Sequence, residues 1–260
     1  MNKLHTAERV SLDMADNFVF QRSLLAYHEA AKRIRGEVLE IGTGTGYGIE
    51  VIAPHAKRFV TIDKHMPPIA EELPENVQFL QAVVPPLPFP SESFDCVISF
   101  QVIEHIADDL AFVREMARVL RPRGRLILTT PNAPMSLTRN PWHVREYYVE
   151  VLQALLGSCF ERVESFGITG NERVQAYYLR NRESVQRLTR WDIFDLQHRL
   201  PRRLLQLPYD WLNRRNRRKL LLEEPDATAA IRMDDYQLEP YREECFDLFI
   251  VAEKGPEREQ

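Results

Sequence analysis

The chain has 260 residues, 44% of them hydrophobic and 28% charged, which fits a single domain spanning 1–260 and excludes wholesale disorder. Its formal net charge of −4 excludes a uniformly basic nucleic-acid binder. The 3 cysteines form no Cys-x-x-Cys pair, so neither a disulfide framework nor a cysteine-rich zinc site is expected. The polar first residues lack the apolar segment of a signal peptide, and no run reaches the roughly 18 apolar residues of a membrane span. We therefore expect a cytoplasmic protein.

Short apolar runs alternate with helical periodicity along the first half of the chain, which predicts an α/β fold with a mostly parallel sheet. A turn at Pro122 and Gly124 should separate the last helix of this half from its last strand. In chain order we predict a helix over 18–34, a strand over 37–41, a short helix ended by Pro54, strands over 58–62, 77–80 and 94–100, a helix over 107–120 and a strand over 125–130.

A change of composition marks the second half. Residues 171–240 indicate a helical, basic insertion before the last strand, broken by Pro201 and Pro208. Residues 171–222 contain 13 Lys and Arg against 5 Asp and Glu, a net charge of +8 that leaves −12 for the remainder. The elements predicted around this insertion are a helix over 146–156 and strands over 160–166 and 246–252.

Four of the 10 glycines stand between Gly42 and Gly48, where the first strand should meet the following helix. Glycine permits positive φ and lets a ligand approach the backbone closely. Asp63 ends the next strand, where an acid can accept hydrogen bonds from both hydroxyls of a ribose. This combination predicts a cofactor that contains a nucleoside.

The glycine spacing excludes two common nucleotide sites. A dinucleotide fingerprint, Gly-x-Gly-x-x-Gly, would need its third glycine at Tyr47 or Ile49, and a P-loop would need a following Gly-Lys-Ser/Thr. Glu40 precedes the first glycine by two residues. A carboxylate there would sit badly beside a pyrophosphate but suits a ligand with an amine or a sulfonium.

The run Val-Leu-Glu-Ile-Gly-Thr-Gly-Thr-Gly at 38–46 resembles the first motif of class I S-adenosylmethionine-dependent methyltransferases. Asp63 and the segments 87–95, 102–106 and 120–132 resemble later motifs of that family in the same order. The resemblance implies a Rossmann-like, doubly wound sheet of seven strands, mostly parallel with one antiparallel strand. It also implies S-adenosyl-L-methionine as the cofactor, bound by Glu40, Gly42, Thr43, Gly44, Gly46, Asp63 and Gln101.

The chain departs from the family in two places. Val83 stands where an acid often holds the adenine amino group, so backbone groups and apolar packing would have to hold the ring. Some O-methyltransferases bind Mg²⁺ through Glu-x-x-Glu-His, but Gln101 replaces the first carboxylate of that pattern here, and no metal is expected. His105, which follows Glu104, and His143 are the candidate catalytic residues, with structural roles as the alternative for each.

The predicted function is methyl transfer to a small-molecule, sugar or lipid-linked acceptor, most simply at oxygen. The core also resembles the ubiquinone-pathway methyltransferases, and the segment 140–147 resembles bacterial methyltransferases of glycan and small-molecule pathways. Two alternatives stay open: a methyltransferase acting on RNA or protein, and a degenerate binding subunit, which the missing acid at Val83 would favour.

The insertion 171–240 would form a substrate lid. Its Arg199–Lys219 segment interleaves arginines with aromatic and aliphatic residues, which is typical of either a solvated helix face or an element that binds an anionic membrane surface. In the second case the protein would be peripheral to the membrane. Nucleic acid is a poor partner for the acidic remainder, and the sequence leaves the oligomeric state undetermined.

Overall fold

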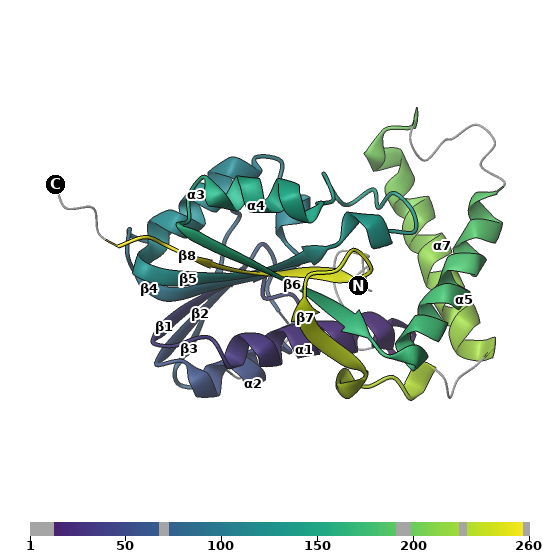
Figure 1. The fold of residues 1–260 in the computed structure, drawn as a ribbon, viewed down its shortest axis with the longest axis horizontal. Helices are drawn as coiled ribbons and strands as arrows, with labels where there is room; N and C mark the ends of the chain where they lie inside the picture. The colour runs from purple at the N-terminus through teal and green to yellow at the C-terminus, as the bar shows by residue number, and fades with distance from the viewer. Residues whose placement is uncertain (1–12, 68–72, 191–198, 224–227, 257–260) are drawn as a thin grey trace.

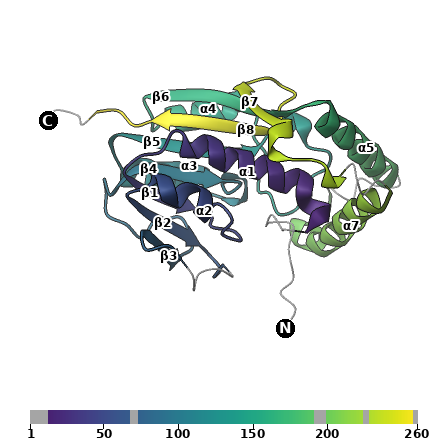
Figure 2. The same cartoon turned by 90° about the horizontal axis from the view of Figure 1, so that it is seen from below.

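An eight-stranded sheet with helices on both faces runs through the described residues of the computed structural model, 13–67, 73–190, 199–223 and 228–256 (Figure 1). α3 (Asp109–Val119) and α4 (Val149–Gly157) cover one face. α1 (Asn17–Ala31) and the short α2 (Ile49–Ile52) lie on the other face, which Figure 2 shows.

The strand order is β3-β2-β1-β4-β5-β8-β6-β7. The first five strands in this order run parallel to one another. β8 is antiparallel to β5 and β6, and β7 is antiparallel to β6. The order reverses between β1 and β4, the place where open α/β sheets bind ligands at the carboxyl ends of the strands. The strands are β1 (Glu37–Ile41), β2 (Arg58–Asp63), β3 (Val77–Gln81), β4 (Phe94–Phe100), β5 (Leu120–Pro131), β6 (Arg162–Gly170), β7 (Tyr236–Pro240) and β8 (Asp247–Glu253).

The alternation of side chains along β1 divides the core into two layers. Leu39 and Ile41 pack with the buried residues of α3 and α4, whereas Val38 packs with those of α1 and α2. Because side chains alternate across a strand, Glu40 shares the face of Val38 and lies under α1. The buried side chains of α3, Phe112, Val113, Met116 and Val119, recur every three to four residues and form one apolar face of the helix.

One close approach fixes how α1 meets the glycine loop. The Tyr27 ring of α1 packs over Gly48, where a Cβ atom would lie 2.1 Å from Cε1 of the ring. The same ring makes edge-to-face contacts with Tyr47 and Phe100. No side chain larger than hydrogen fits at position 48 while the tyrosine holds this place.

The seven-strand prediction was wrong, because Tyr236–Pro240 forms an additional edge strand, β7, on β6. This stretch alternates apolar and polar residues, the pattern of an edge strand, but the sequence analysis included it in the insertion. The predicted turn at Pro122 and Gly124 was also wrong, because both residues lie within β5, which begins at Leu120.

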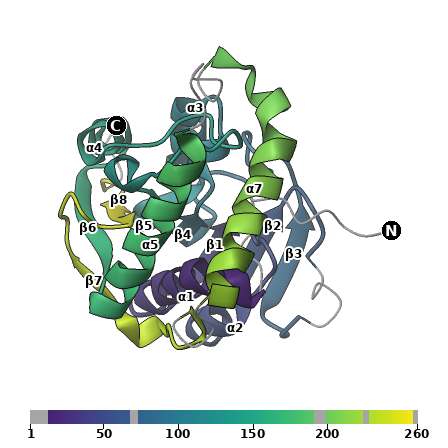
Figure 3. The same ribbon diagram turned by 90° about the vertical axis from the view of Figure 1, so that its right-hand side faces the viewer.

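The insertion contains two long described helices, α5 (Glu172–Thr189) and α7 (Arg202–Glu223), which lie side by side at one end of the molecule (Figures 1 and 3). Pro208 lies inside α7 and does not break it, contrary to the prediction. Asn216 of α7 donates to Asn181 of α5 through its amide nitrogen at 2.8 Å. Residues 191–198 and 224–227 of the insertion and 1–12 of the domain lie outside the described residues. None of the described helices is long and apolar enough to span a membrane.

Candidate cofactor and active site

A pocket of about 460 Å³ opens at the carboxyl ends of β1, β2 and β4. Its wall contains the start of the glycine loop, the end of β2, the segment after β4, Trp142 and one residue of α7. Of the predicted cofactor residues, Gly42, Thr43, Gly44, Asp63 and Gln101 line the pocket, whereas Glu40 and Gly46 do not.

The glycine loop adopts a conformation that side chains disfavour. Gly42, Gly44 and Gly46 have φ of 98°, 60° and 86°. A Cβ atom at Gly42 would also lie 2.5 Å from a methyl group of Val102. The loop is tied to β2, because the N–H groups of Gly42 and Thr43 both donate to the carbonyl of the strand's penultimate residue. The backbone of the loop is therefore held open toward the pocket.

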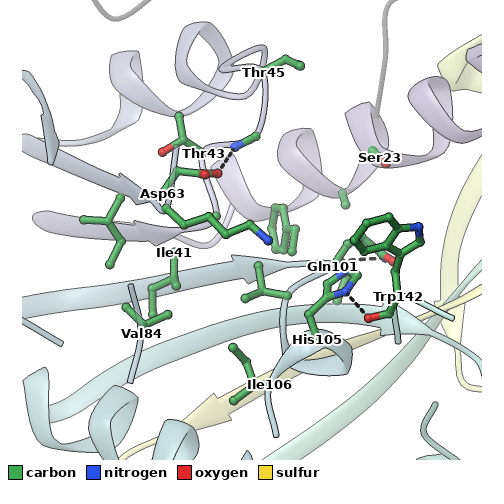
Figure 4. A pocket seen from close by; sticks show the side chains of 18 of the residues that line it. Ser23, Ile41, Thr43, Thr45, Asp63, Val84, Gln101, His105, Ile106 and Trp142 are labelled. Carbon is green, nitrogen blue, oxygen red and sulfur yellow. Dashed lines mark hydrogen bonds between the residues drawn. The ribbon is translucent and has the colours of Figure 1, made fainter. Parts of the chain in front are cut away.

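Asp63 joins the end of β2 to the same loop (Figure 4). Its Oδ2 accepts from the Gly44 N–H at 2.9 Å and its Oδ1 accepts from the His65 N–H at 2.8 Å. Carboxylate oxygens are also the acceptors that suit the two hydroxyl groups of a ribose. The carboxylate is held in place before any ligand arrives.

Glu40 lies behind the pocket wall. It is 2% exposed, and its two carboxylate oxygens accept from Tyr27 Oη at 2.7 Å and from Thr61 Oγ1. Thr61 Oγ1 also lies 2.6 Å from Thr43 Oγ1. Burial raises the pKa of Glu40 to about 7, although the two hydroxyl donors oppose this shift. In this arrangement Glu40 fixes two residues that line the pocket, Tyr27 and Thr43.

The side of the pocket beyond Asp63 is apolar. Ala82, Val83 and Val84 line it, and the Val83 side chain is 77% exposed. The Ala82 N–H donates to the backbone carbonyl of Asp63 at 3.0 Å, which sets the position of this wall. Among the described lining residues the only acids are Asp63 at the end of β2 and Asp247 at the start of β8. Neither belongs to this apolar wall, so no carboxylate replaces the acid missing at Val83.

Gln101 follows β4 with a φ of 56°, and its N–H donates to the Thr129 carbonyl at 2.9 Å. Beside it lies Asp247, a lining residue that the sequence analysis did not single out. Asp247 is 2% exposed and pairs with Arg22 at 2.7 Å, while burial raises its pKa. The available signal was a lone carboxylate at the start of an otherwise apolar strand.

The structure brings the two candidate catalytic histidines together. Their rings meet edge to face with centroids 5.0 Å apart, but only His105 lines the pocket. His105 Nδ1 lies 3.0 Å from the Trp142 carbonyl oxygen (Figure 4). His143 lies behind, with Nδ1 2.9 Å from Glu146 Oε1 and Nε2 2.8 Å from Asn140 Nδ2.

Glu104 completes a group of three residues that could hold a metal ion. It is 1% exposed, and one ligand atom from each of Glu104, His105 and His143 lies within 4.8 Å of the others. Burial raises the pKa of Glu104 to about 7, opposed in part by His143. No spacing pattern in the sequence shows this group, because His143 belongs to a different segment of the chain.

α7 reaches the pocket from the insertion through Gln206, which lines its wall. Two contacts hold the helix there. Trp142 Nε1 donates to Asp210 Oδ1 at 2.9 Å, and Arg202 donates to the His143 carbonyl at 3.1 Å. The pocket is therefore bounded by the glycine loop and Asp63 on one side and by α7 of the insertion on the other.

Comparison with known proteins agrees with this geometry. Residues 39–128 match a methyltransferase domain family. A "probable S-adenosylmethionine-dependent methyltransferase" of Mycolicibacterium smegmatis is 32% identical over 259 residues, which is 95% of this chain and 93% of that protein. A protein of the same description from Mycobacterium tuberculosis (strain H37Rv) is 39% identical over 160 residues, 58% of each chain. That alignment therefore spans little more than half the length of the M. tuberculosis relative.

Two solved structures share the fold. YcgJ of Bacillus subtilis has a TM-score of 0.52 and 19% identity, covering 92% of this chain and 99% of its own. The [4+2]-cyclase SpnF has a TM-score of 0.54 and 18% identity, covering 90% and 81%. With the glycine loop, Asp63 and the full-length relative, the chain belongs to the S-adenosylmethionine-dependent methyltransferases. S-adenosylmethionine is the cofactor of this enzyme family, as predicted.

Proposed function

We propose that this chain transfers the methyl group of S-adenosylmethionine to a small-molecule, sugar or lipid-linked acceptor, most simply at oxygen. The observation that carries the proposal is one continuous pocket. It extends from the glycine loop and Asp63 to His105, Trp142 and Gln206, with room for a cofactor and part of an acceptor. Because the sulfonium methyl is already electrophilic, alignment of the two reactants supplies much of the rate acceleration.

Two sets of residues have separate roles in this proposal. Gly42, Thr43, Gly44, Asp63 and Gln101 line the part of the pocket that would hold the cofactor. Glu40 and Gly46 act from behind, through the conformation of the loop. A "ubiquinone biosynthesis O-methyltransferase" of Parvibaculum lavamentivorans is 31% identical over 100 residues, 36% of this chain and 40% of that protein. The name of this relative supports a lipid-like acceptor.

His105 is the proposed general base for an acceptor hydroxyl. A proton on Nδ1 is donated to the Trp142 carbonyl, which places the lone pair of the imidazole on Nε2. His143 packs edge to face on this ring and acts as a positioning residue. We expect His105→Gln to lower kcat more than His143→Gln, and to remove the acid limb of the pH profile.

α7 is the proposed substrate lid, because Gln206 lies in the pocket wall. We expect Gln206→Ala to raise KM for the acceptor and leave the affinity for S-adenosylhomocysteine unchanged. Leu222→Ala is the matched control on the same helix, since that side chain is 79% exposed, does not line the pocket and lies outside Arg199–Lys219. Loss of cofactor affinity in Gln206→Ala would contradict the lid assignment.

The outward side of α7, within Arg199–Lys219, is the proposed contact with an anionic membrane surface. Leu204, Leu207 and Trp211 are 64%, 72% and 59% exposed, and the exposed Arg215 lies over the Trp211 ring at 5.3 Å. Apolar side chains beside arginines on one helix favour the interface of anionic lipids. We expect vesicles with phosphatidylglycerol to bind the wild type but not Trp211→Ala, and vesicles of phosphatidylcholine alone to bind neither. Equal binding of both vesicle types would contradict this contact.

The acceptor class can be found directly. Wild type and Asp63→Ala are incubated with methyl-labelled S-adenosylmethionine and a cell extract, followed by separation of lipid, small-molecule, nucleic-acid and protein fractions. Label in the lipid or small-molecule fraction with the wild type alone supports the proposal. Label in RNA or protein would favour a macromolecular substrate, and failure to bind S-adenosylhomocysteine in calorimetry would indicate a degenerate site.

A further inference from the structure

Two segments that are far apart in the sequence converge behind the pocket wall. Glu104 and His105 belong to the short 3₁₀ turn Ile103–His105 that follows β4, and His143 precedes α4. The Val144 N–H donates to the Glu104 carbonyl at 2.7 Å and joins the segments. A carboxylate and two imidazoles are thereby held with one donor atom each within 4.8 Å of the others.

Each of the three side chains also has a hydrogen-bond partner outside the group. His105 Nδ1 contacts the Trp142 carbonyl at 3.0 Å, and His143 Nδ1 contacts the carboxylate of Glu146 at 2.9 Å. Thr130 donates to Oε2 of Glu104 at 3.1 Å. Metal-binding histidines commonly donate their second ring nitrogen to a carbonyl or carboxylate in this way, which fixes the tautomer and presents the other nitrogen.

The tautomer of His143 has independent support. Nδ2 of Asn140 lies 2.8 Å from His143 Nε2, and an amide NH₂ group donates. Nε2 therefore bears the lone pair that coordination requires, and the proton lies on Nδ1, toward Glu146. A metal ion would take the place of the Asn140 amide at this lone pair.

The charge of the group also favours a cation. Glu104 is 1% exposed and, among its described contacts, has no lysine or arginine ion-pair partner. An ionised carboxylate in such a place is costly unless it is paired with a cation or coordinates a metal.

We propose that Glu104, His105 and His143 bind a divalent transition-metal ion, with Zn²⁺ as the probe. Two imidazoles and a carboxylate form a set that zinc accepts, with bonds of about 2.0–2.2 Å. Donor atoms in such a site lie roughly 3–4 Å apart, so the group has to close by about 1 Å around the ion. The set differs from the Glu-x-x-Glu-His pattern, because Gln101 replaces one carboxylate and His143 supplies the third donor.

A metal ion here would lie next to the acceptor side of the pocket, because His105 is also a lining residue. A hydroxyl that coordinates a divalent ion loses its proton more easily, so with the ion bound the metal would replace His105 as the group that activates the acceptor, because a coordinated imidazole nitrogen cannot also accept a proton. This use of the ion rests on the proposed function, whereas the binding of the ion does not.

The test is titration of the chelator-treated full chain with Zn²⁺ by calorimetry. We expect one ion per chain in the wild type, at least 100-fold weaker binding in His143→Gln, and about 10-fold weaker binding in Glu146→Gln, which loses only the outer partner. His55→Gln is the control, because that histidine is exposed in the 3₁₀ turn Ala53–His55. Equal Zn²⁺ affinity in the wild type and His143→Gln would overturn the proposal.

A second measurement covers variants that do not fold. Co²⁺ added to the wild type should give the intense visible absorption of a tetrahedral site with nitrogen ligands, and one equivalent of Zn²⁺ should abolish it. Absence of that absorption would also overturn the proposal. Both readouts are independent of methyl transfer, so failure of the proposed activity would leave them unaffected.

Discussion

The buried carboxyl group of Glu40 makes the stability of this protein depend on pH. Its pKa is raised from 4.5 to about 7 by burial between β1 and α1, so the folded state holds a proton that the unfolded state releases. The stabilising protonated form is fully present below pH 4.5 and is lost as the pH rises toward 7. A shift of this size corresponds to about 3 kcal/mol of lost stability above pH 7.

Glu40→Gln removes this ionisation. The amide, like the protonated carboxyl group, has a donor on one side and an acceptor on the other, so the variant differs from the protonated wild type by a constant offset in stability from one altered hydrogen bond. The offset does not vary with pH. The free energy of unfolding of the variant minus that of the wild type should therefore rise between pH 4.5 and 7 and be constant outside that window.

Urea denaturation at pH 5 and pH 8 measures this difference. We expect most of the roughly 3 kcal/mol to appear as a relative gain for Glu40→Gln at pH 8. Glu104, whose pKa is also raised to about 7, is present in both proteins and cancels in the comparison. A difference that is the same at both pH values would refute the reasoning, because it would mean that Glu40 titrates normally in the folded state.

Three further predictions concern the pocket and its support. Gly42→Ala should cost more than Gly44→Ala, about 3 against about 1 kcal/mol in urea denaturation, because a Cβ fits without contact only at the second position; equal costs would contradict the assigned loop geometry. Asp63→Asn should weaken S-adenosylhomocysteine binding about 10- to 100-fold in calorimetry, since bonds to a charged acceptor become neutral; an unchanged affinity would exclude the ribose contact. Arg22→Met should destabilise the fold by about 3 kcal/mol or more by leaving Asp247 buried without its cation, and Asp247→Asn in the same chain should restore much of the loss in thermal melts.

The parallel half of the fold could be predicted because its signals are local. β1, β2, β4 and the second half of β5 each contain a short apolar run, and the glycine loop and Asp63 mark the carboxyl ends that meet in one pocket. β7 was missed because five residues at the end of a long polar stretch gain their strand conformation only by pairing with β6. Pro208 was read as a break because local propensity disfavours it, while the contacts of α7 outweigh that cost.

The site was less accessible to sequence reasoning, since partners on different elements decide each role. Glu40 is separated from the pocket by Tyr27 and Thr61, which belong to α1 and β2. The pairing of His105 with His143 depends on the path of the loop before α4. Neither relation leaves a spacing pattern in the chain.

The contact between Tyr27 and Gly48 limits how this sequence can diverge. The tyrosine supports Glu40, borders the pocket and occupies the volume of any side chain at position 48. A larger residue at 48 would be tolerated only in a lineage that had already lost the tyrosine ring, and with it the hydroxyl that holds the buried acid. We expect positions 27 and 48 to co-evolve, with position 40 as a third member. Changes in the cofactor loop should therefore be accompanied by changes in α1.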